Sequence, residues 1–116
     1  MARVSTLENA HMFAPFVETK MRMRTYVVNA GAAQIALSAE TPPVVICDPG
    51  GGAIDLLLPA ESEGLIFWIV NTADAAEAIT VKEDSDTTTV ISVAQNEAAL
   101  VVCDGTNWHA LQGATA

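Results

Sequence analysis

From residue 25 onward, short apolar and β-branched stretches alternate with clusters of Gly, Pro, Asn and Asp. No stretch keeps the 3.6-residue period of an amphipathic helix, and strands bounded by turn residues show this pattern. The stretches begin about 9–13 residues apart, a spacing typical of sandwiches and barrels. We therefore expect an all-β fold, a small β-sandwich or barrel-like domain. The predicted strands are Arg24–Val28, Ala33–Leu37, Val44–Cys47, Ala53–Leu58, Leu65–Val70, Ala78–Lys82, Thr88–Val93, Ala98–Cys103 and Trp108–Leu111.

The segments between these strands carry specific turn chemistry. In 48–52 (Asp-Pro-Gly-Gly-Gly), proline fixes one φ angle and three glycines accept positive φ, so a strand ends there sharply. Segment 104–107 (Asp-Gly-Thr-Asn) separates two apolar stretches, and Asp-Gly is a strong hairpin signal. We therefore expect the last two strands to pair. The acidic segment 83–86 is interpreted as a solvated hairpin tip, because it lacks the glycine and terminal glutamate of a calcium loop.

The stretch Leu65–Val70 is apolar on both of its faces. Alternate residues of a strand point to opposite sides, so Phe67 and Ile69 share one side while Ile66, Trp68 and Val70 share the other. Neither side is suited to water, and both need a cover. One cover is the core; the other is either a second subunit or the protein's own loops. Ile66, Trp68, Val70 and Trp108 are accordingly predicted to lie in an oligomer interface or in the core.

The charges divide the chain into two parts. The 116 residues, enough for one domain, carry 14 acidic and 5 basic side chains and a net charge of −9. In residues 1–24, four cations oppose two acids; in residues 25–116, Lys82 is the one cation among twelve acids. We therefore divide the chain into an N-terminal arm, residues 1–24, and a β body, residues 25–116.

The predicted arm mixes cations with large apolar side chains and contains Pro15, which interrupts a helix there. Such a segment cannot bury a core of its own, so it either lies across the acidic body or reaches another molecule. The residues expected to make that contact are Arg3, Met12, Phe13, Phe16, Lys20, Arg22 and Arg24.

The sequence contains no recognisable catalytic or cofactor motif. Cys47 and Cys103 lack the paired ligands of a zinc site and are interpreted as buried free thiols, although a disulfide is the alternative. His11 and His109 have no neighbouring nucleophile and orienting acid, and Gly50–Gly52 lacks the Lys-Ser/Thr of a phosphate loop. We therefore predict no enzyme, no cofactor and no metal site.

Composition also excludes several partners. Five cations are too few for a main role in binding nucleic acid, which depends on neutralising phosphates. The longest apolar run has six residues, far below the ~20 that span a bilayer. We expect no secretion signal in residues 1–24, no membrane partner, and folding in a cytoplasm.

Four segments of the body follow a familiar order. They are 54–59 (Ile-Asp-Leu-Leu-Leu-Pro), 64–72 (Gly-Leu-Ile-Phe-Trp-Ile-Val-Asn-Thr), 79–81 (Ile-Thr-Val) and 97–111, which ends in the hairpin Asp-Gly-Thr-Asn-Trp. This order resembles a β module of tailed-bacteriophage structural proteins, and in particular head decoration (cement) proteins of the lambda-like type. The resemblance covers residues 53–112.

The resemblance implies a β-tulip-type body that forms a trimer on the outer surface of the expanded phage head. The partner would be the major capsid protein, contacted by the N-terminal arm, and the function would be stabilisation of the head against DNA pressure. The protein would be made and assembled in the bacterial cytoplasm and reside in the virion. Two alternatives stay open: another virion protein, such as a tail-fibre or head-fibre module, and a carbohydrate-binding β module.

Overall fold

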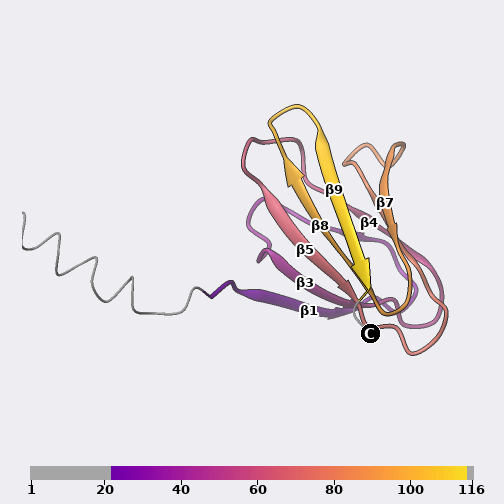
Figure 1. Cartoon of the computed structure of the whole chain (residues 1–116). Coiled ribbons are helices and arrows are strands. Elements are labelled where there is room, and N and C mark those ends of the chain that lie inside the picture. The colour runs from indigo at the N-terminus through magenta and orange to yellow at the C-terminus, as the bar shows by residue number, and fades with distance from the viewer. Residues whose placement is uncertain (1–21, 115–116) are drawn as a thin grey trace, which may run out of the picture.

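The computed structural model describes residues 22–114, which form nine strands in two sheets packed face to face (Figure 1). All nine predicted strands are present, with ends that differ by at most three residues. The all-β prediction is confirmed. The strands are β1 (Thr25–Asn29), β2 (Ile35–Ala36), β3 (Val44–Asp48), β4 (Ile54–Leu57), β5 (Ile66–Asn71), β6 (Ile79–Lys82), β7 (Thr89–Val93), β8 (Glu97–Cys103) and β9 (Trp108–Ala114).

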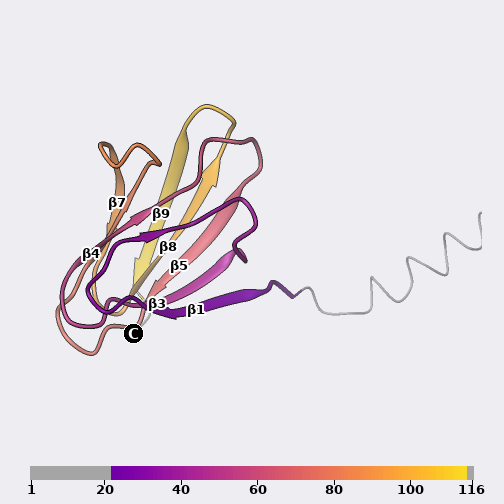
Figure 2. The same cartoon turned by 180° about the vertical axis from the view of Figure 1, so that it is seen from behind.

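The first six strands alternate between the two sheets. The five-stranded sheet has the order β1-β3-β5-β8-β9, and the four-stranded sheet has the order β2-β4-β6-β7. Within each sheet the alternating strands pair in parallel: β1 with β3 and β3 with β5, and likewise β2 with β4 and β4 with β6. The sharp turn after β3 therefore carries the chain into the other sheet instead of closing a hairpin. Figure 1 looks onto the five-stranded sheet, and Figure 2 looks from the side of the four-stranded one.

Antiparallel hairpins complete both sheets. β6 pairs with β7, and the acidic segment 83–86 lies at the tip of that hairpin, as predicted. β8 pairs with β9 through the predicted turn 104–107. In that turn Gly105 has φ 102°, and one carboxylate oxygen of Asp104 accepts hydrogen bonds from the backbone N–H groups of Thr106 and Asn107, both at 2.8 Å. The expected pairing of the last two strands is confirmed.

The core lies between the sheets and takes alternate residues from each strand. In β5 the inward side chains are Phe67, Ile69 and Asn71, all buried. Phe67 packs against Trp108 of β9, with ring centroids 6.2 Å apart. Cys47 and Cys103 are buried in this core as free thiols, as predicted. Burial and the neighbouring Asp48 carboxylate raise the pKa of Cys47 to about 11, so its thiol stays protonated at neutral pH.

Asn71 is the one polar residue that the structure buries in the core of residues 22–114. Its side-chain amide donates to the carbonyls of Glu77, at 2.8 Å, and Val93, at 3.0 Å. Its side-chain oxygen accepts from the N–H of Ala73, at 2.9 Å. These three bonds satisfy the amide and tie the β5–β6 connection to β7.

Most of the predicted arm lies outside the described residues, and with it Arg3, Met12, Phe13, Phe16 and Lys20. Arg22, Met23 and Arg24 are described; all three are exposed and lead into β1, at one edge of the five-stranded sheet. In the part of the chain that the structure describes, no helix has the length and apolar character needed to cross a bilayer.

Candidate interaction surface

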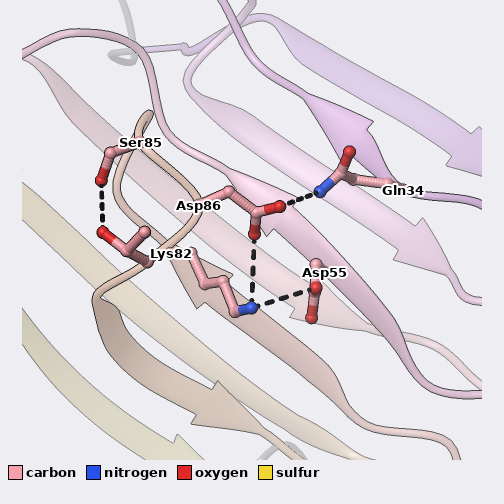
Figure 3. A network of polar contacts seen from close by, with 6 residues as sticks. Gln34, Asp55, Lys82, Ser85 and Asp86 are labelled. Atoms are coloured by element: carbon pink, nitrogen blue, oxygen red, sulfur yellow. Dashed lines mark hydrogen bonds and ion pairs between the residues drawn. The ribbon is translucent and has the colours of Figure 1, made fainter.

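The outward faces of the two sheets have opposite character. On the four-stranded sheet, the ammonium of Lys82 lies 3.2 Å from Asp55 and 3.3 Å from Asp86 (Figure 3). Gln34 donates to the second carboxylate oxygen of Asp86, at 3.1 Å. The hydrogen bonds that Lys82 donates to the two carboxylates raise its pKa, and the bond to Asp55 is the larger cause. This face is therefore polar and suited to water.

The outward face of the five-stranded sheet carries almost no charge. Strand register places its side chains in rows, so that Val44, Trp68, Leu100 and Leu111 follow one another across β3, β5, β8 and β9. At the outward positions of these five described strands, the one carboxylate is Asp48, at the end of β3. We call the following ten outward residues the apolar face: Val27, Val44, Ile46, Ile66, Trp68, Val70, Ala98, Leu100, Val102 and Leu111.

Several residues of the apolar face are open to solvent. Leu111 and Val27 are 70% exposed, Trp68 is 44% exposed and Ile66 is 39% exposed. Five strands about 4.8 Å apart and about five residues long give the face a flat area of roughly 400 Å². Exposed apolar patches of this size on a single chain commonly mark interaction sites. Figure 1 looks onto this sheet and shows no segment of residues 22–114 in front of it, so the protein's own described loops are not its cover.

The apolar face contains two hollows. One, of about 230 Å³, is lined by Trp68, Ala98, Leu100, Leu111, Gln112 and Gly113. The other, of about 220 Å³, is lined by Leu100, Val102, His109, Ala110 and Leu111. The first arises because two small residues, Ala98 and Gly113, stand opposite each other in the register. Leu100 and Leu111, also opposite each other, line both hollows and form a ridge between them.

An ionisable pair lies at the rim of the apolar face. His109 Nε2 is 2.8 Å from Asp104 Oδ2, and both side chains are largely exposed. The backbone N–H of Asn107, the His109 contact and the backbone N–H of Thr106 hold the pKa of Asp104 well below its usual value. The carboxylate therefore stays ionised in mild acid and keeps the β8–β9 turn closed.

Three carboxylates gather at the opposite end of the sheet. Oxygens of Asp48, Asp74 and Glu77 lie within 4.8 Å of one another. Hard cations such as Ca²⁺ take such oxygen ligands, but they need six or more, and these three side chains are an incomplete set. The group is best described as a cluster of repelling charges. Sequence reasoning missed it, because Asp48 ends β3 whereas Asp74 and Glu77 lie in the β5–β6 connection.

The structure separates the predicted interface-or-core residues. Ile66, Trp68 and Val70 belong to the apolar face, whereas Trp108 is in the core. Sequence reasoning missed Val27, Leu100, Val102 and Leu111 as part of the same surface. The available signal was the run Ala98–Val102, which is apolar on both sides in the same way as β5.

Compared with protein-family models, with curated proteins and with solved structures, the chain matches none.

Proposed function

We propose that this protein is a structural component of a bacteriophage virion, a decoration protein that binds the outside of the expanded head as a trimer. The observation that carries the proposal is the uncharged apolar face on one side of an otherwise acidic body. A surface of that kind serves contact between proteins. The resemblance of residues 53–112 to the phage structural module supplies the class of assembly.

The proposed mechanism is mechanical and thermodynamic. A protein that binds the expanded shell and not its precursor stabilises the expanded form by mass action. Three linked arms of one trimer hold the shell with an avidity that a single arm lacks. Neighbouring capsid subunits would in this way be clamped against the pressure of the packaged DNA.

The position of β1 supports a role for the residues that precede it. β1 is an edge strand, and the exposed Arg22, Met23 and Arg24 lead into it from outside the sheet. Residues 1–24 carry four of the five cations in the chain, so their charge differs in sign from that of the body. We assign the capsid contact to this arm, which would bind an acidic or apolar loop of the major capsid protein.

A second candidate is a module of a tail fibre or head fibre. The chain from β1 to β6 passes back and forth between the two sheets and so forms a coil of parallel strands. This favours a fibre role, because successive coils of that kind stack along an axis. A carbohydrate-binding role has less support. Of the four aromatic residues in the described range, only Trp68 is exposed, and sugar sites generally need an aromatic platform.

The decisive experiment is the copy number of this chain relative to the major capsid protein in purified particles. A ratio near one supports a decoration protein that covers the shell. A few copies per particle would favour the fibre role, and absence from particles would overturn both virion assignments.

Binding to expanded shells that lack the protein tests the arm separately. Removal of residues 1–24 leaves all nine described strands in the chain. The truncated protein is expected to keep the circular dichroism spectrum of the full chain and to stop sedimenting with shells. Undiminished co-sedimentation would contradict the assignment of the arm.

A further inference from the structure

The ridge and the two hollows of the apolar face supply the two halves of a contact between copies. Leu111 protrudes from the ridge with 70% of its surface exposed, and a hollow large enough for an aliphatic side chain lies on each side of it. An identical copy presents the same knob and the same hollows. Surfaces that offer both halves of a contact are what symmetric homo-oligomers use.

Charge favours a second copy as the occupant. The chain has a net charge of −9, and two copies repel each other wherever their acidic surfaces approach. The apolar face is the side of the body on which identical copies meet with the least opposing charge, because Asp48 lies at the far end of β3, away from the hollows on β8 and β9, and Asp104 at the rim is paired with His109. A strongly basic partner would find Asp104 at the rim of this surface, and that carboxylate already pairs with His109.

We propose that the β5–β8–β9 part of the apolar face is the interface between copies of this chain, with Leu111 of one copy seated in a hollow beside Leu100 of the next. This inference rests on the proposed function in one respect only, that the assembly consists of identical copies. It identifies the contact surface, which the resemblance does not supply. Binding to a shell is a separate event and involves the arm.

Two residues of equal exposure provide the test. Leu111 and Val27 are both 70% exposed and both point outward from edge strands of the same sheet, but Leu111 lines the hollows and Val27 stands at the opposite edge, on β1. Leu111→Asp places a charge in the proposed interface, whereas Val27→Asp places the same charge outside it. Size-exclusion chromatography with light scattering gives the mass of the full-length variants over a range of concentrations.

We expect the wild type and Val27→Asp to be oligomeric and Leu111→Asp to weaken association by at least about a hundredfold, as a central interface residue does. A monomeric wild type would overturn the inference and assign the apolar face to a different partner. Dissociation by Val27→Asp with Leu111→Asp still oligomeric would also overturn it, because the contact would then lie on β1.

Gly113→Leu is a second variant that adds no charge. A Cβ at this position meets no atom within 4 Å, and Gly113 lines the hollow beside Trp68, so the leucine side chain is expected to extend into that hollow. It is expected to fill the place of the incoming Leu111 and to reduce the oligomer as Leu111→Asp does. Full oligomerisation of Gly113→Leu would contradict seating in that hollow. A wild-type protein that forms the oligomer but does not bind shells would count against the proposed function alone.

Discussion

Phe67 and Trp68 are neighbours in β5 with opposite surroundings, since Phe67 is buried between the sheets and Trp68 is half exposed on the apolar face. Phe67→Ala opens a cavity in the core and is expected to lower the free energy of unfolding by about 3–5 kcal/mol. Trp68→Ala leaves no enclosed cavity and should cost less, roughly 1–2 kcal/mol. Urea denaturation at low protein concentration measures both, and equal losses would show that Trp68 is also a core residue.

The buried amide of Asn71 holds three backbone groups. Asn71→Leu keeps a similar volume but leaves the carbonyls of Glu77 and Val93 and the N–H of Ala73 without this partner. We expect a loss of about 2–4 kcal/mol in the free energy of unfolding, because buried unpaired groups are costly. Gln95→Leu, which removes one partly buried bond to Ala73, is the control and should cost about 1 kcal/mol or less. Similar losses in the two variants would contradict the role given to Asn71.

Acid stability tests the turn at Asp104. Its pKa is lowered in the folded state, so its contribution is complete above the unfolded value of ~3.9 and is lost as pH falls below it. Asp104→Asn should therefore reduce stability at pH 7 and flatten the decline of the melting temperature between about pH 4 and pH 2. A decline as steep as that of the wild type would show that other carboxylates determine acid unfolding.

The cluster of Asp48, Asp74 and Glu77 predicts a stabilising substitution. Asp74 is exposed, and its conversion to Asn relieves repulsion without disturbing the core. We expect a gain of about 0.5–1 kcal/mol in low salt that shrinks as salt screens the charges. Asp84→Asn, in the exposed β6–β7 tip, removes the same charge outside the cluster and should change stability less; an equal gain would indicate a general effect of net charge.

Gly31 and Gly50 both have positive φ, but only Gly50 lacks room for a Cβ. Substitution at the two positions therefore distinguishes the cost of a steric clash from the cost of the backbone conformation. Gly50 has φ 78°, and a Cβ there collides with the Asn29 side chain and approaches the Gly31 nitrogen to 2.8 Å. Gly31 has φ 60° and open space around a Cβ. Gly31→Ala should cost about 1–2 kcal/mol, from the left-handed conformation alone, and Gly50→Ala clearly more. Equal thermal shifts would mean that the 48–52 turn adapts easily.

The strands and both hairpins could be predicted because their causes are local. Alternation of apolar residues defines a strand, and the Asp-Gly pair at 104–105 defines a turn. The partners of β1 to β6 could not be predicted in this way. Alternation shows which side chains share a face, but it does not show that Val44 will stand beside Trp68 in a parallel ladder.

The candidate surface also depends on contacts between distant residues, which local alternation does not determine. The sequence indicated that both faces of Leu65–Val70 need a cover, but it could not show which face would lie inward. That choice depends on Phe67 meeting Trp108 across the sheet, a contact between residues 41 positions apart. The hollows depend on Ala98 and Gly113 standing opposite each other, which the hairpin register determines.

The alternation of β1 to β6 between the sheets also affects the order in which the chain can fold. The hairpins β6–β7 and β8–β9 join close neighbours in sequence, whereas each parallel pair must close a loop of roughly twenty residues before its first hydrogen bond forms. Local pairs generally form first, so the C-terminal hairpins would provide the template on which β5, β3 and finally β1 are added. A chain emerging from the ribosome would then hold its first strand unpaired until its last strands are complete.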